Sequence, residues 1–286
     1  MTISTIREIL VQAEQKYGTE DAVRYKIGKD AIEAKSYTDL KKDSERFSGV
    51  LEALGVEKGH VAVTGMTSYP WLVTYFGTVN SGNVCVPLDV SLPLEEMCEL
   101  IDRADATVLV VDEIRKDVML AAKAKCPKLR SVISMQKEAE DEEALSFWQL
   151  VNGQKEECSY ESKPEDLATI MFTSGTTGKS KGVMLTHRNL AENATCLDMK
   201  FPERTVILSV LPIHHAYCLS MDILKGLSLG SVICINDSLI RMAKNIKLFK
   251  PGVILMVPLM IETMAKKLQD AAGLPPEIVK REVFGE

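Results

Sequence analysis

Residues 169–190 of the 286-residue chain read TIMFTSGTTGKSKGVMLTHRNL. Residues 169–172 are apolar enough for a buried strand and run directly into a loop, residues 173–182, that is rich in glycine, serine and threonine. Glycines let the backbone turn tightly and bring its N–H groups close to an anion. The donors expected in this loop are Thr173, Ser174, Gly175, Thr176, Thr177 and Gly178, with positive charge from Lys179 and Lys181. The composition therefore suits the binding of a triphosphate or of a leaving pyrophosphate.

Two other interpretations of this loop are open. A flexible polar turn has a similar composition, because Gly, Ser and Thr gather in loops. The Walker A loop, G-x-x-x-x-G-K-[ST], shares the run of Gly178, Lys179 and Ser180. Its upstream glycine would fall on Thr173, so the spacing excludes a Walker A loop.

The segment resembles the signature loop of the adenylate-forming superfamily, which includes acyl-CoA synthetases, luciferases and peptide-synthetase adenylation domains. The family pattern is roughly [YF]-T-S-G-T-T-G-x-P-K-G-V, and residues 172–179 and 181–183 match it. Ser180 replaces the usual proline, which removes some rigidity but no donor. The resemblance implies that the loop and Lys181, the expected catalytic residue, hold the β- and γ-phosphates of ATP as pyrophosphate leaves.

Further segments extend the resemblance over nearly the whole chain. Residues 36–40, 81–89, 164–168 and 186–190 are similar to family segments that surround the loop. Residues 211–217, LPIHHAY, resemble the family's L-P-[LM]-[FH]-H segment, which implies that His215 lines the acyl and nucleotide pocket. The alternative for His215, and more so for His214, is an ordinary core or surface histidine. Cys218 stands where many members have glycine.

The resemblance implies the N-terminal part of an AMP-dependent ligase that activates a carboxylic acid, expected to be a fatty acid. ATP and Mg²⁺ would serve the first step, and coenzyme A would accept the acyl group in the second. An adenylation domain that loads an amino or aryl acid onto a carrier protein, and a non-catalytic nucleotide-binding module, remain alternatives. The family's downstream Y-G-x-T-E and T-G-D segments and its lysine-bearing lid domain do not occur in this sequence, so the chain is expected to be truncated and inactive alone.

Composition bears on several other properties of the protein: nucleic-acid binding, metal binding, cellular compartment and membrane spans. The net charge is −6, which gives no support to nucleic-acid binding. Seven cysteines without a C-x-x-C pair favour a reducing, cytoplasmic compartment, and no metal site is expected from the spacing of the histidines. No apolar stretch approaches the roughly 18 residues of a membrane span. The oligomeric state stays open.

Apolar strand patterns alternate with helical patterns, which predicts an α/β fold with parallel sheets covered on both faces. The expected strands are residues 60–64, 83–88, 107–111, 167–173, 205–210, 230–235 and 252–257. The N-terminal residues predict an amphipathic helix, and Thr38 is a candidate cap for the next one. The acidic stretch 137–166 suggests a boundary between two αβα doubly wound subdomains, residues 1–160 and an incomplete 161–286.

Overall fold

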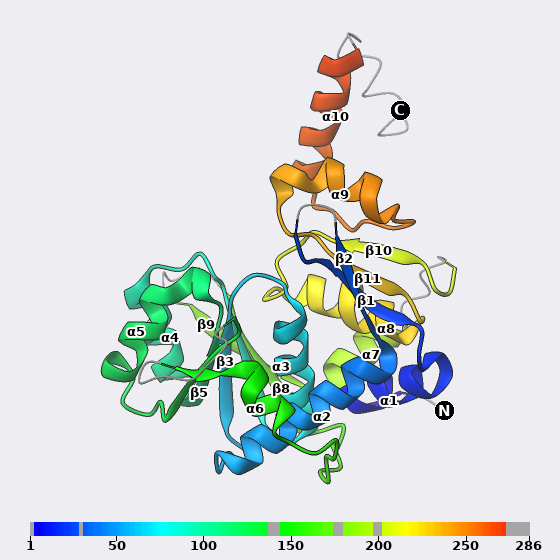
Figure 1. Ribbon diagram of the computed structural model, residues 1–286. Coiled ribbons are helices and arrows are strands. Elements are labelled where there is room, and N and C mark those ends of the chain that lie inside the picture. Colours follow the sequence, from blue (N-terminus) through cyan, green and yellow to red (C-terminus); the bar gives the residue numbers. More distant parts are fainter. Residues whose placement is uncertain (1–2, 29–30, 137–143, 174–179, 197–201, 273–286) are drawn as a thin grey trace.

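The computed structural model describes residues 3–28, 31–136, 144–173, 180–196 and 202–272, with side chains as far as residue 266. Two sheets form the framework (Figure 1). The predicted α/β class is confirmed. Among the described helices, none has both the length and the apolar composition to cross a membrane.

The larger sheet has the strand order β7-β6-β5-β3-β4-β8-β9 within the described residues. Its strands are β3 (His60–Thr64), β4 (Val84–Leu88), β5 (Ala106–Val111), β6 (Ser131–Ser134), β7 (Leu145–Ser146), β8 (Leu167–Thr173) and β9 (Lys181–Thr186). Neighbouring strands are parallel except β8 and β9, which form an antiparallel pair. Four strands expected from the sequence, those near residues 60, 84, 107 and 167, are therefore confirmed.

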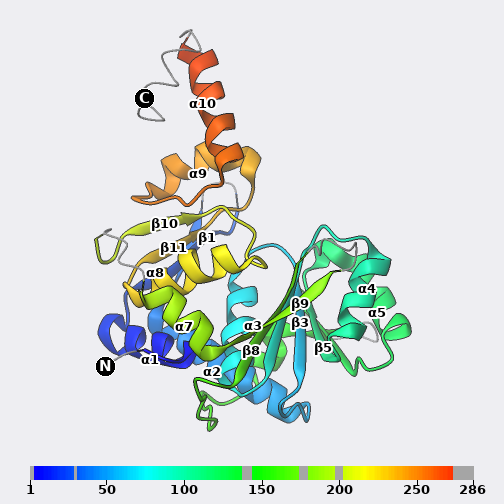
Figure 2. The ribbon, with the colours of Figure 1, turned by 180° about the vertical axis from the view of Figure 1, so that it is seen from behind.

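Helices cover both faces of this sheet. The helices α2 (Tyr37–Ala53), α3 (Tyr69–Asn80) and α6 (Phe147–Asn152) lie on one face, and α4 (Leu94–Arg103) and α5 (Lys116–Lys125) on the other (Figure 1 and Figure 2). Successive side chains of a strand point to opposite faces. Val61 and Val63 accordingly join the core beneath α2 and α3, while Ala62 joins the core beneath α4 and α5. The expected doubly wound arrangement is confirmed for this sheet.

The smaller sheet has the order β10-β11-β1-β2. Its strands are β1 (Asp21–Lys26), β2 (Ile32–Ser36), β10 (Val206–Ser209) and β11 (Val232–Ile235), and its helical neighbours include η2 (Cys218–Leu224), a π-helix, and α8 (Lys225–Ser228). The sequence suggested a division of the chain at residue 160, but the two sheets do not follow that division. The early strands β1 and β2 join late strands, while β8 and β9 join the larger sheet. Periodicity along the chain locates a strand but carries no information about its partners.

Helix α1 (Ile6–Tyr17) helps to join the two sheets, because it packs against α2, α3, α7 (His187–Cys196) and α8. Its predicted apolar face is buried: Ile6, Ile9, Leu10 and Ala13. His187, the first residue of α7, is also fully buried, and its Nδ1 atom accepts a hydrogen bond from the N–H of Ile6 at 3.3 Å. One continuous core therefore runs beneath both sheets.

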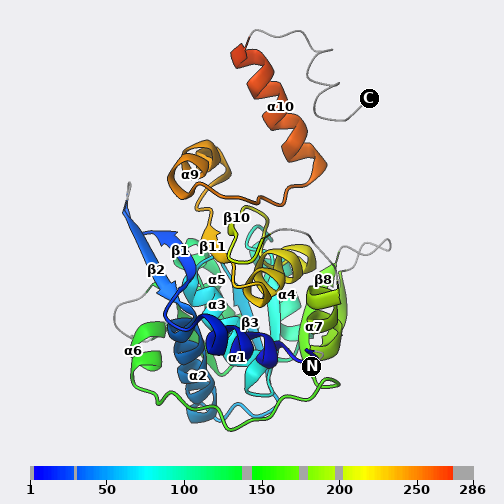
Figure 3. The ribbon, with the colours of Figure 1, turned by 90° about the vertical axis from the view of Figure 1, so that its right-hand side faces the viewer.

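Two local expectations were wrong. Ser36, not Thr38, caps α2, because its side chain accepts the N–H of Asp39 while the Asp39 carboxylate accepts the N–H of Ser36. Residues 252–257 form no strand, although Val253 forms an isolated β-bridge with Ile207 of β10. The short helix η1 (Glu113–Arg115) lies between β5 and α5. A second short helix, η3 (Leu239–Arg241), leads into α9 (Met242–Phe249). The chain then continues into α10 (Pro258–Ala272), which projects from the sheets (Figure 3).

Candidate functional site

The carboxyl ends of parallel strands from both sheets surround a cavity of about 310 Å³. Its lining comprises residues 65–67 after β3, 89–91 after β4, 209–215 at the end of β10, and Asn236, Ser238 and Leu239 after β11. The helices that follow β3 and β4, α3 and α4, lie on opposite faces of the sheet. A crevice opens at such a reversal, and ligands of open α/β sheets bind there. The fold therefore places a binding site at this edge.

A second cavity, of about 390 Å³, adjoins the first and shares three of its residues, Asp89, His214 and His215. It reaches Thr173 at the end of β8 and Ser180, which immediately precedes β9. These two residues belong to the predicted phosphate loop and lie on either side of residues 174–179. Ser174, Gly175, Thr176, Thr177 and Gly178 lie outside the described residues. The structure thus brings the two ends of the loop to the predicted pocket residue His215.

Lys181 is exposed at the first position of β9, opposite Thr173 in the strand register. Its side chain is not part of the lining of either cavity. Because Thr173 lies in the second cavity, Lys181 is held next to the site by the hairpin that β8 and β9 form.

The sequence favours His215 over His214 as the pocket residue, yet both histidines line both cavities. Their ring centroids are 4.2 Å apart, and the Nε2 atom of His214 lies 3.6 Å from Oδ2 of Asp89. Burial lowers the pKa of His214, and the nearby Asp89 carboxylate opposes that change. Nε2 of His214 is buried and has no hydrogen-bond partner within the described parts of the chain.

Asp89 is the site residue that the sequence did not single out. Burial raises the pKa of its carboxyl group, but hydrogen bonds from the N–H and hydroxyl of Ser91, with the two histidines, hold that pKa below its ordinary value. The guanidinium of Arg115 donates to the carbonyls of Val90 and Leu92, both at 2.8 Å, and so fixes the turn. The sequence could have indicated Asp89, because this residue follows directly after a predicted parallel strand, where ligands of such sheets bind.

The buried side chains of Cys218 and Asp222 lie next to the start of the histidine segment, residues 211–217. The thiol Sγ of Cys218 lies 3.3 Å from the carbonyl oxygen of Leu211, which it can donate to, and 3.8 Å from Oδ2 of Asp222. Asp222 is fully buried, and burial raises its pKa to about 7. Its other oxygen has no partner in the described structure. In sequence, its signal was one carboxylate inside the mostly apolar run of residues 218–224.

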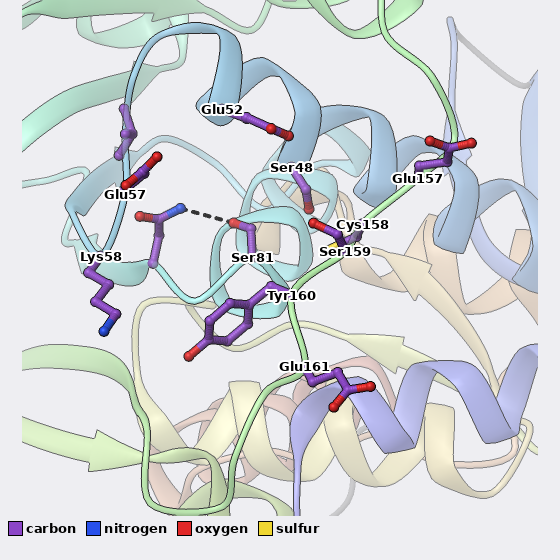
Figure 4. Close-up of a pocket in the computed structure, with 12 residues that line it drawn as sticks. Ser48, Glu52, Glu57, Lys58, Ser81, Glu157, Cys158, Ser159, Tyr160 and Glu161 are labelled. Atoms are coloured by element: carbon purple, nitrogen blue, oxygen red, sulfur yellow. Dashed lines mark hydrogen bonds between the residues drawn. The ribbon is translucent and has the colours of Figure 1, made fainter.

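A larger cavity, of about 770 Å³, lies at the opposite ends of β3 and β4 (Figure 4). Glu57 and Lys58 precede β3, Ser81 precedes β4, and residues 157–161 complete the wall. The amide nitrogen of Asn83 donates to the Ser81 hydroxyl there. Ligands of parallel sheets bind beyond the carboxyl ends, and this cavity lies at the amino ends, so size alone does not make it the functional site.

Metal ligands do not gather in the part of the chain that the structure describes, because no three His, Cys, Asp or Glu side chains lie close enough to share an ion. All seven cysteines are unpaired thiols.

Two sheets that share a cleft, with Thr173, Ser180 and a histidine segment at its edge, define the fold of the N-terminal domain of adenylate-forming enzymes. The family model described as AMP-binding enzyme matches residues 10–280, and the chain belongs to that family. The predicted family is therefore confirmed.

Known proteins agree with this membership. The human protein named long-chain-fatty-acid–CoA ligase ACSBG2 is 26% identical over 289 residues, which cover 93% of this chain and 43% of that protein. The chain thus spans less than half the length of this relative. The N-terminal domain of FACL13 from Mycobacterium tuberculosis, solved with an inhibitor, superposes with a TM-score of 0.82 at 20% identity, over 94% of this chain and 67% of that one. ATP-bound MatB from Rhodopseudomonas palustris gives 0.76 at 26% identity, over 92% and 51%.

Proposed function

We propose that this chain supplies the N-terminal part of an acid–thiol ligase, which activates a fatty acid with ATP and then transfers the acyl group to coenzyme A. The observation that carries the proposal is the meeting of Thr173, Ser180, His214 and His215 at one cavity. The hydroxyls of Thr173 and Ser180 are donors suited to phosphate oxygens, and Lys181 adds a cation beside them.

In the first step a carboxylate oxygen attacks the α-phosphorus of ATP, and pyrophosphate leaves. The two reactants are both anionic, so the protein contributes chiefly by positioning them and by stabilising the charge that moves onto the leaving group. Thr173 and Lys181 would face the β- and γ-phosphates, with His215 on the acyl side of the cleft. Mg²⁺ carried by the nucleotide would neutralise part of the triphosphate charge. In the second step the thiol attacks the acyl-adenylate and AMP leaves, so no protein nucleophile is required.

An apolar acid suits the lining of the second cavity. Leu88, Leu92, Leu100 and Phe172 contribute apolar surface there. Apolar walls with a few polar groups are typical of sites for small organic ligands. The names of relatives such as ACSBG2 point in the same direction. The unpaired cysteines support a reducing, cytoplasmic compartment, which stays part of the proposal.

Pyrophosphate exchange with the full-length protein tests the proposal. We expect ATP–pyrophosphate exchange with long-chain fatty acids, followed by acyl-CoA formation when coenzyme A is added. Exchange with amino or aryl acids alone would contradict the fatty-acid ligase and would favour an adenylation domain that loads a carrier protein. An absence of exchange with every acid, in a protein that still binds ATP in a calorimeter, would favour a non-catalytic nucleotide-binding module.

A further inference from the structure

The phosphate loop leaves the larger sheet at the end of β8 and returns to it at the start of β9. The two strands are in antiparallel register, with Thr173 opposite Lys181 and Phe172 opposite Gly182. Contacts that hold these two strand ends in place therefore also hold the two ends of the loop that connects them.

Gly182 leaves room for the aromatic ring on the neighbouring strand. A Cβ atom added to Gly182 would lie 3.1 Å from a methyl carbon of Ile170 and 3.5 Å from the ring of Phe172. The ring of Phe172 therefore lies close against the backbone of Gly182. An added Cβ atom would be tight against Ile170 and would touch the Phe172 ring at an ordinary van der Waals distance.

Arg103, the last residue of α4, contacts both strand ends. The carbon Cζ of its guanidinium lies 5.7 Å from the centroid of the Phe172 ring, within the range of a cation–π interaction. Its Nη2 atom donates a hydrogen bond to the carbonyl oxygen of Ser180 at 2.8 Å. The carboxylate of Glu99, one turn earlier in α4, lies 3.4 Å from its Nη1 atom. One side chain thus holds the residue before Thr173 and the residue before Lys181.

The chemistry of this contact is specific to arginine. A planar guanidinium can stack on a ring and donate from its edge at the same time, whereas the ammonium of lysine is a point charge without that geometry. Ser180 also stands where the related loops have proline, a residue that restrains its own backbone. The hydrogen bond from Arg103 restrains the same position from outside.

We propose that Arg103 is a positioning residue for ATP, which holds the two ends of the phosphate loop at the spacing needed to bind the triphosphate. The proposal rests on the function proposed above. Arg103 is partly exposed, with 38% of its side chain accessible, so its contacts are screened by water and its contribution is modest.

The first test measures pyrophosphate exchange in the full-length enzyme with Arg103→Met, which removes both contacts and keeps the aliphatic stem. We expect the KM for ATP to rise about three- to tenfold, with kcat changed less than about twofold, as fits the loss of two exposed contacts. The KM for the acid and the melting temperature should stay near their wild-type values. Arg103→Lys should rescue only part of the ATP affinity, because it cannot both stack and donate.

Lys128→Met is the matched control. Lys128 is likewise exposed and pairs with Asp102 and Asp105, the neighbours of Arg103, but does not contact the loop ends in the described structure. It should leave the KM for ATP unchanged. An equal effect of both substitutions, or a fall in melting temperature that accompanies every kinetic change, would overturn the positioning role.

The second test needs no activity. Trypsin can cleave after Lys179 and after Lys181, and cleavage at these bonds without nucleotide reports how firmly the loop ends are held. We expect faster cleavage in Arg103→Met than in wild type and in Lys128→Met. Phe172→Leu should produce the same change and add little to Arg103→Met. If wild type shows no exchange, the proposed function fails, and equal cleavage rates would still overturn the role of Arg103 by themselves.

Discussion

The Nε2 atom of His214 lies 3.6 Å from Oδ2 of Asp89, and this contact joins the edges of the two sheets. Asp89 follows β4 of the larger sheet, and His214 follows β10 of the smaller one. Because both side chains line both cavities, this contact crosses the cleft where we place the substrates.

Asp89→Asn tests whether this contact controls the charge of the histidine. Burial already lowers the pKa of His214, and the carboxylate opposes it, so removing the negative charge should lower that pKa further. Titration of the histidine ring protons by NMR measures the change. Partly exposed pairs stabilise folding by no more than about 1 kcal/mol, so the melting temperature should change little. Asp105→Asn, at an exposed carboxylate paired with Lys128, is the control. An unchanged or raised pKa in Asp89→Asn would rule the contact out.

Lys181→Ala should slow adenylation without unfolding the protein. Loss of a charge-assisted contact to phosphate should cost about 2–3 kcal/mol of transition-state stabilisation, or roughly 30- to 150-fold in kcat/KM for ATP. The side chain is exposed, so its removal leaves no cavity in the core. Lys244→Ala, an exposed lysine of α9, is the control. A lower melting temperature with unchanged exchange would show that Lys181 is structural.

Asp222→Asn should change how stability depends on pH. Burial raises the folded-state pKa of Asp222 to about 7 from an ordinary value of 3.8. Between these pH values the folded protein keeps a proton that the unfolded chain releases, so this group lowers stability as pH rises from about 4 to 7, and its effect is constant above 7. Asparagine has nearly the same shape and does not titrate. We expect the variant to gain about 2–4 kcal/mol over wild type at pH 8 and little at pH 4.5.

Urea denaturation at pH 4.5, 6, 7 and 8 measures this difference. The same pH slope in both proteins would show that Asp222 does not titrate in this range. Cys218→Ala is an informative companion, because it removes the thiol between Asp222 and the Leu211 carbonyl and leaves the carboxyl group in place. It should retain the fall in stability with rising pH, because the buried carboxyl group that titrates is still present.

Gly77→Ala tests the close packing of α2 against α3. A Cβ atom at Gly77 would lie 2.6 Å from the carbonyl oxygen of Ser44 and 2.9 Å from Cβ of Phe47, and neither can move easily. We expect a loss of about 1–3 kcal/mol, although alanine favours helix more than glycine does. Gly49→Ala is the matched control in α2, because its Cβ would meet only the flexible side chain of Gln154. Thermal unfolding of both variants should show a destabilised Gly77→Ala and an unchanged or more stable Gly49→Ala.

The sequence alone determined the features that depend on residues close to one another along the chain. The apolar face of α1, the strands from His60 and Leu167, and the glycine- and hydroxyl-rich loop all follow from patterns a few residues long. The match of residues 172–179 and 181–183 to the signature pattern also sufficed to identify the family. His215 could be placed near the loop by the resemblance of its segment.

The tertiary structure decided which distant segments meet. It pairs β1 with β11 and β8 with β4, places Asp89 beside His214, and brings Arg103 to the ends of the phosphate loop. Sheet partners and contacts between helix ends and loops depend on how the whole core packs. Hydrophobic periodicity, which reports only the buried side of each element, holds no record of that arrangement.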